Sequence, residues 1–222
     1  LLETQWPIVE LKDTPGGVQA FRFEYHGKWF EDPRKLNEPN MVSAVSFWLP
    51  TEFLAARGPE QVRQLALELA TLLPFNSGHA GLSFNALTGL FSGPEEWRDL
   101  AFRYPGMDIG GLDSIDWHLG TRIRAPHWLT FLGQPVLDEL GGVSGLRSRL
   151  SAPGTTVEPL AGNRSVVTLG TWPEAGDMQE GRNLPEYREL ARALEPWLYQ
   201  QPPLRNYRPS ETWQRWERRF LD

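Results

Sequence analysis

The histidines and carboxylates are the side chains of this sequence most able to do chemistry, because they bind metals and move protons. The four histidines are His26, His79, His118 and His127. None of them lies in an H-E-x-x-H zinc motif. The tightest group of acids and imidazole is Asp113, Asp116 and His118. On an extended strand Asp116 and His118 would point to the same side, and this arrangement permits a metal site. The alternative is a surface turn with solvated charges.

Other catalytic patterns are incomplete. Glu10-Leu11-Lys12 matches the E-x-K fragment of metal-dependent nucleases, but only Glu3 precedes it as a second acid, so we interpret the match as accidental. The segment 81–85 lacks the final glycine of a G-x-S-x-G nucleophile turn. The chain has no cysteine, which excludes disulfides, thiolate catalysis and cysteine-bound metal. We therefore expect no catalytic residues and no cofactor.

An arginine-rich C-terminus is the one feature typical of nucleic-acid binding. Its residues are Arg205, Arg208, Arg215, Arg218 and Arg219, with Tyr207, Trp213 and Trp216 between them. The alternative is a last helix whose cations favour its C-terminal dipole and whose tryptophans pack on the protein. The whole chain has a formal charge of −6, which disfavours phosphate binding, so we predict no nucleic-acid partner. No apolar run approaches the ~18 residues that a membrane span needs.

The elements that must position these residues are mixed in type. Alternation of apolar residues predicts strands at 19–26, 43–49 and 80–86. Residues 128–132 are interpreted as a buried strand or extended segment, and 157–160 and 165–169 as a hairpin around Ala161-Gly162-Asn163. Helical spacing predicts helices at 59–73, 94–103, 135–140, 145–150 and 185–198, and a last short helix that Ser210 caps. The expected fold class is α+β, with mixed or antiparallel sheets packed with helices. We predict a single domain over residues 1–222, possibly two similar halves that meet near 110–120.

Several short segments resemble the type VI secretion system immunity protein family (TsiV-like). The strongest is Trp128-Leu129-Thr130-Phe131-Leu132-Gly133, followed by Leu140-Gly141-Gly142. Further similar segments are Gly78-His79-Ala80-Gly81, Arg103-Tyr104-Pro105-Gly106 and Leu184-Pro185-Glu186-Tyr187-Arg188. Together the similar segments are scattered over most of the chain, from Val18 onward, and their order and spacing also resemble the family.

The resemblance implies an immunity protein that binds and neutralises a cognate toxin effector, with a nuclease-type toxin favoured. Such a protein would occlude the active site of the toxin, would not be an enzyme and would act in the cytoplasm, without a membrane partner. An acidic inhibitor can meet the basic cleft of a nuclease with fast, steered association. The alternatives are a small metal-dependent hydrolase that uses Asp113, Asp116 and His118, and a structural subunit of a secretion or envelope assembly.

Candidate contacts with the toxin lie in one loop that combines aromatic rings and acids. Its residues are Trp29, Phe30, Glu31 and Asp32, to which we add the acids Asp113 and Asp116. Aromatic side chains beside charges are typical of interface hot spots. The alternative for this loop is that its rings fold back on the core.

Overall fold

The computed structural model describes residues 6–13, 21–30, 38–85, 95–109, 111–112, 115–203 and 209–222. The chain divides into two compact units. Unit 1 comprises Leu1–Gly58, Asn85–Gly93 and Gly110–Gly120, and unit 2 comprises Pro59–Phe84, Pro94–Ile109 and Thr121–Asp222. The single domain over 1–222 and the duplication near 110–120 stay predictions. A single cooperative unfolding transition would support the single domain.

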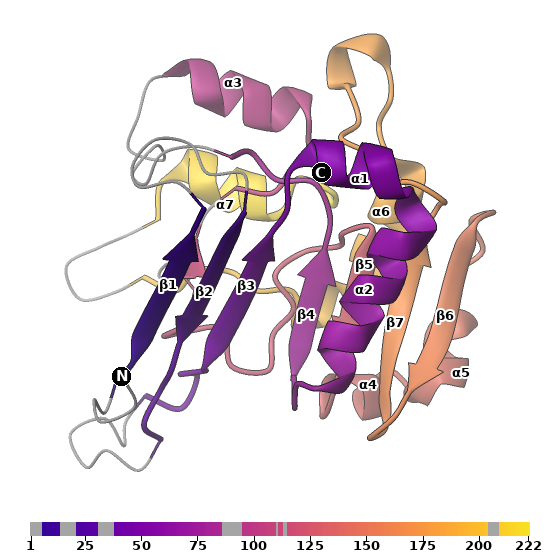
Figure 1. Ribbon diagram of the computed structural model, residues 1–222. Helices are drawn as coiled ribbons and strands as arrows, with labels where there is room; N and C mark the ends of the chain where they lie inside the picture. Colours follow the sequence, from indigo (N-terminus) through magenta and orange to yellow (C-terminus); the bar gives the residue numbers. More distant parts are fainter. Residues whose placement is uncertain are drawn as a thin grey trace. The chain divides into compact units, whose positions relative to one another are not determined.

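Unit 1 contains a three-stranded antiparallel sheet, ordered β1-β2-β3 (Figure 1). Its strands are β1 (Ile8–Lys12), β2 (Arg22–His26) and β3 (Ala44–Trp48), and the helix α1 (Thr51–Arg57) follows. The strands predicted at 19–26 and 43–49 are confirmed with shorter bounds. The strand β1 and the helix α1 were not predicted from the sequence.

Unit 2 contains a four-stranded antiparallel sheet, ordered β4-β5-β7-β6. Its strands are β4 (Ser77–Ala80), β5 (Leu129–Leu132), β6 (Thr155–Leu160) and β7 (Arg164–Leu169). The α-helices are α2 (Pro59–Thr71), α3 (Glu95–Arg103), α4 (Val136–Glu139), α5 (Gly142–Arg147), α6 (Pro185–Leu194) and α7 (Glu211–Glu217), with 3₁₀ turns at Met178–Glu180 and Glu195–Trp197. The predicted hairpin is confirmed: Gly162 and Asn163 have the positive φ angles that a tight β-turn requires.

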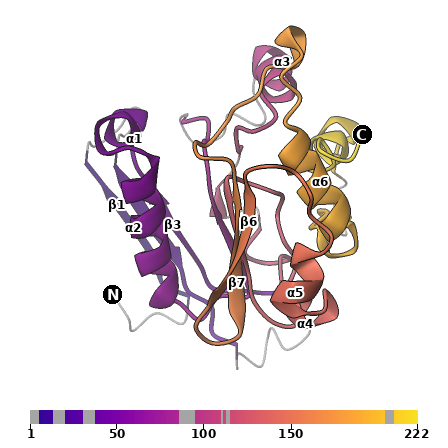
Figure 2. The ribbon, with the colours of Figure 1, turned by 90° about the vertical axis from the view of Figure 1, so that its right-hand side faces the viewer.

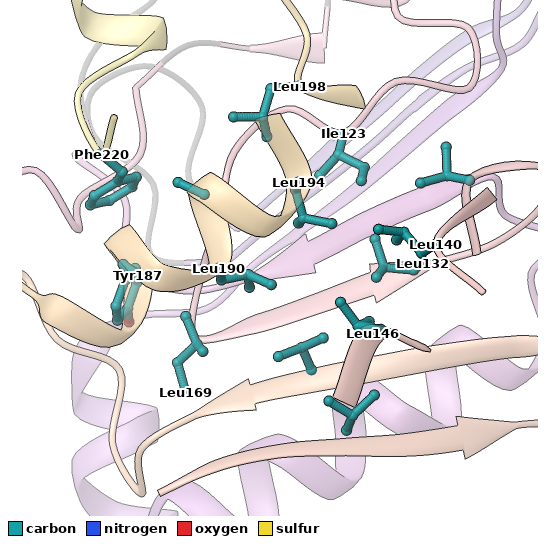
Figure 3. Close-up of a cluster of buried hydrophobic side chains, with 14 of the residues drawn as sticks. Ile123, Leu132, Leu140, Leu146, Leu169, Tyr187, Leu190, Leu194, Leu198 and Phe220 are labelled. Carbon is teal, nitrogen blue, oxygen red and sulfur yellow. The ribbon is translucent and has the colours of Figure 1, made fainter. Parts of the chain in front are cut away.

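Both faces of this second sheet are covered by helices. On one face Phe131 and Val166, which are cross-strand neighbours, pack with Ala66 and Ala70 of α2. On the other face α4, α5 and α6 lie together (Figure 2), and the larger core cluster gathers there (Figure 3). Leu190 and its neighbours on α6 are almost fully buried, and each such side chain stabilises the fold by about 1.5–3 kcal/mol. The predicted α+β class is therefore confirmed.

The C-terminal arginines and tryptophans take part in packing where the structure describes them. The Ser210 hydroxyl accepts a hydrogen bond from the Trp213 backbone N–H at 3.1 Å, which confirms the predicted helix cap. Arg219 is buried, stacks 3.8 Å from the ring of Trp216 and donates to the carbonyl oxygen of Pro105 at 2.7 Å. The packing alternative is thus confirmed for Trp216 and Arg219. Arg205, Tyr207 and Arg208 lie outside the described residues.

Three predicted bounds were wrong. The strand expected at 80–86 ends at Ala80, and the following residues pair with Asp108 instead, whose N–H donates to the carbonyl of Leu82. The helix expected at 145–150 begins at Gly142. The helix expected at 185–198 ends at Leu194, because Pro196 cannot continue its hydrogen bonds. Within the described ranges, every helix is too short or too polar to cross a membrane.

Candidate partner-binding surface

One face of the unit 1 sheet is entirely apolar. Cross-strand partners share a face, so the register places six residues together: Val9, Leu11, Phe23, Tyr25, Val45 and Phe47. We call them the apolar sheet face. Leu11 is 62% exposed and Phe47 is 45% exposed, and among the described hydrophobic residues of unit 1 only Met41 and Ile115 are buried. Exposed apolar surface of this kind marks interaction sites.

The opposite face of the same sheet is mixed: Ile8, Ala44 and Trp48 share it with charged and polar side chains that contact one another. The Lys12 ammonium lies 2.6 Å from the Glu10 carboxylate, and the Ser46 hydroxyl donates to Glu24 at 2.9 Å. The guanidinium of Arg22 lies 4.2 Å from the ring centroid of Trp48. An antiparallel sheet normally buries its apolar face and exposes its polar one. Unit 1 departs from this rule at Leu11 and Phe47, the two exposed side chains of its apolar face.

Most of the net negative charge also belongs to unit 1. Its segments contain ten acidic and six basic residues, whereas the larger unit 2 contains eighteen and sixteen. Unit 1 therefore accounts for −4 of the formal charge of −6. A surface that combines exposed apolar groups with negative charge is suited to a basic protein partner.

A buried ion pair fixes the chain just before the predicted aromatic contacts. The Lys28 ammonium donates to Asp116 Oδ2 at 2.6 Å, and His26 Nδ1 lies 3.0 Å from the same oxygen. The side chains of Lys28 and Asp116 are only 6% and 2% exposed. The Lys28 ammonium also lies 4.1 Å from the ring centroid of Trp117. These contacts hold the end of β2 in place.

The structure brings part of the predicted contact set together. Phe30 is 59% exposed and Trp29 is half-buried, directly after the residue that Asp116 holds. The carboxylate of Asp116 faces Lys28 and His26, so it positions the aromatic residues through Lys28. Glu31, Asp32 and Asp113 lie outside the described residues. As contacts with a partner, all six residues stay predictions.

The sequence analysis missed a cluster in unit 2. His79 lies on β4, His127 precedes β5 and Asp108 follows α3, and their ligand atoms all lie within 4.8 Å of one another. The two imidazole rings stack with centroids 3.8 Å apart. No spacing in the sequence indicates this group, because the antiparallel pairing of β4 with β5 creates it. In the described ranges it is the one set of three such residues able to hold a metal ion.

Burial and neighbouring charges set the protonation of this cluster. Burial, with a contribution from His79, lowers the pKa of His127 to about 4, so its ring is neutral at pH 7. Burial alone would raise the pKa of Asp108, but Arg124 and the two histidines hold it well below its usual range. Asp108 is therefore an anion. Burial also lowers the pKa of Arg219 to about 9, which leaves it charged at pH 7.

Known structures share this architecture. A chain described as Pseudomonas aeruginosa T6SS protein PA0821 superposes with a TM-score of 0.79 at 22% sequence identity. The superposition covers 99% of the present chain and 65% of the P. aeruginosa chain, so the present chain spans about two thirds of that protein's length. This likeness shows a shared fold. No functionally curated sequence matches the chain.

The sequence assigns the family directly. The family TsiV, described as type VI immunity for VRR-NUC, matches residues 2–220. The chain therefore belongs to this family of type VI immunity proteins. The resemblance recognised in the sequence is confirmed.

Proposed function

We propose that this protein binds a cognate nuclease effector of the VRR-NUC class and keeps it from nucleic acid. The match of the type VI immunity family over residues 2–220 carries this proposal. The protein acts by covering the active site of the toxin, without making or breaking a covalent bond. It works in the cytoplasm, where a nuclease toxin reaches its nucleic acid.

The apolar sheet face supplies the core of the interface. Three strands of five residues, with a rise of about 3.4 Å per residue and a spacing of about 4.8 Å, present a face of about 240 Å². A stable complex buries about 800 Å² on each partner, of which the centre is apolar and the rim polar. The face has the size of such a centre, and surrounding loops must supply the rim.

Charge favours the same partner. A nuclease needs a positive cleft to meet phosphates, and unit 1 carries most of the net negative charge of the chain. Opposite charges accelerate encounter and select the correct partner more than they strengthen the final complex. The acidic unit therefore steers the effector, and apolar burial holds it.

The predicted loop forms part of the rim. Phe30 is exposed enough to enter a pocket on the partner, and the ion pair between Lys28 and Asp116 reduces the freedom that binding must remove. Trp29, Glu31, Asp32 and Asp113 complete the proposed contacts, and Asp116 contributes through Lys28.

Co-expression with the nuclease effector of the adjacent gene tests the proposal. We expect the two proteins to co-purify, the nuclease activity to fall in proportion to added immunity protein, and cells to survive the effector. Protection should require the immunity protein in the cytoplasm, so a version exported to the periplasm should not protect against a cytoplasmic nuclease. Loss of both co-purification and inhibition would contradict the proposal. So would substrate turnover by this chain alone that one substitution abolishes.

A further inference from the structure

The cluster of His79, Asp108 and His127 has the donor set of a transition-metal site. Two imidazoles and one carboxylate are ligands that zinc accepts in proteins, with further positions filled by water. The three residues come from three separate segments of unit 2, and their ligand atoms lie within 4.8 Å of one another. An ion bound there would join β4, the segment before β5 and the segment after α3.

The distances between the ligand atoms match a tetrahedral ion. Asp108 Oδ2 lies 3.2 Å from His79 Nε2 and 3.7 Å from His127 Nε2. Two ligand atoms that each lie about 2.1 Å from a tetrahedral ion are about 3.4 Å apart. The two observed distances lie on either side of this value. The two imidazole rings, stacked with an interplanar angle of 15°, must turn out of this arrangement for both lone pairs to point at one ion.

The Nε2 nitrogen of His127 has no hydrogen-bond donor beside it. His127 Nδ1 lies 2.9 Å from the carbonyl oxygen of Ala125, which can only accept, so the hydrogen of the neutral ring is on Nδ1. His127 Nε2 then presents a lone pair. This atom is buried without a hydrogen-bond partner, in a side chain only 1% exposed, and it faces the Asp108 carboxylate. Two acceptors that face each other in a buried site leave the imidazole nitrogen unsatisfied, and a cation bound between them would satisfy both.

The surroundings orient the ligands and leave an entry path. Asp108 Oδ1 accepts a hydrogen bond from the Ile109 N–H at 2.8 Å and lies 3.4 Å from the Arg124 guanidinium. Such outer contacts fix the direction of a ligating carboxylate, as the Ala125 carbonyl fixes the imidazole. The His79 side chain is 28% exposed, so an ion can reach the site from solvent.

Nearby charges set how firmly the ion is held. Arg124 and Arg219 are buried cations, and Asp108 and Glu217 are buried anions, so these four groups are neutral together. The ligand set, and not a surplus of negative charge, must therefore provide the affinity. This favours an exchangeable ion over a permanently enclosed one.

We propose that His79, Asp108 and His127 bind one divalent transition-metal ion of the zinc class. The ion stabilises unit 2, whereas the apolar sheet face belongs to unit 1. The inference does not depend on the identity of the toxin.

Metal titration of the full-length, untagged protein tests this site. After treatment with a chelator and dialysis against zinc, we expect one zinc per chain by elemental analysis, and a higher melting temperature with zinc than with chelator. Cobalt(II) should give visible absorption bands of a four-coordinate site with nitrogen and oxygen ligands. Wild-type protein that takes up neither ion, by both elemental analysis and spectroscopy, would overturn the proposal.

Variants locate the ion. His79→Gln changes a partly exposed side chain and should fold normally, yet should weaken zinc binding by more than about 100-fold, above the range for loss of an outer-shell partner. His26→Gln is the matched control, because His26 also lies 3.0 Å from an aspartate but lacks a second imidazole. Zinc binding should be unchanged in this control. Equal zinc binding by wild type and His79→Gln would refute the assignment, and His127→Ala repeats the test at the buried ligand if it folds.

Discussion

Phe47 lies on the apolar sheet face, and its truncation to alanine tests whether this face meets the effector. A phenylalanine side chain buries about 200 Å² when fully enclosed, and Phe47 is 45% exposed in the free protein. A partner can thus bury about 90 Å² more, which at about 25 cal/mol per Å² is about 2 kcal/mol. We expect Phe47→Ala to weaken binding of the effector about 30-fold.

The assay is the dissociation constant for the purified nuclease effector, measured by calorimetry beside inhibition of its nuclease activity. Phe47 also lies 5.3 Å from Phe23, a pair that contributes about 0.5–1.5 kcal/mol to the fold. Unfolding in denaturant must therefore confirm that the variant is folded at the assay temperature. Leu72→Ala is the control, because Leu72 is an apolar residue of unit 2 that is 81% exposed.

The outcome is decided by the comparison of the two variants. We expect Leu72→Ala to bind the effector as the wild type does. Binding by a folded Phe47→Ala variant within twofold of the wild type would refute the proposed contact through the sheet face. An equal loss in both variants would refute it as well, because the effect would then not be local to unit 1.

The remaining predictions concern charge and stability. Asp116→Ala should destabilise the fold by about 3–5 kcal/mol, because it leaves the buried Lys28 ammonium unpaired. The double change Lys28→Met with Asp116→Leu should lower the free energy of unfolding by less. Urea unfolding measures both variants. The hydrogen bonds from Arg103 lower the pKa of Asp177, so this pair stabilises the fold above pH about 4 and stops doing so as the pH falls further. Asp177→Asn should therefore lose less stability than the wild type between pH 7 and pH 3, in the same unfolding assay. The association rate with the effector should fall as salt rises from about 0.05 M to about 0.5 M while the dissociation rate changes little, which stopped-flow fluorescence can follow.

The sequence alone determined the class of fold and the longer elements. Helices α2 and α6 and the hairpin of β6 and β7 follow from apolar periodicity and from turn residues, which act between near neighbours in the chain. The family was also readable from short structural segments, because residues such as those of β5 are buried and therefore constrained. The absence of cysteine excluded thiolate chemistry, and the acidic charge favoured a basic partner over nucleic acid.

Only the tertiary structure decided which side chains meet. The sequence analysis grouped Asp113, Asp116 and His118 because they are close in the chain. In the folded protein Asp116 contacts Lys28 and His26 instead. It also brings His79 and His127 into contact through the pairing of β4 with β5. Likewise, alternation predicted that one face of β2 is apolar, but only the register of three strands joins it to the apolar residues of β1 and β3 in one continuous face. Local sequence patterns determine local conformation. Strand pairing and burial join segments that are distant in the chain, and their free energy depends on both partners, so one segment alone does not reveal it.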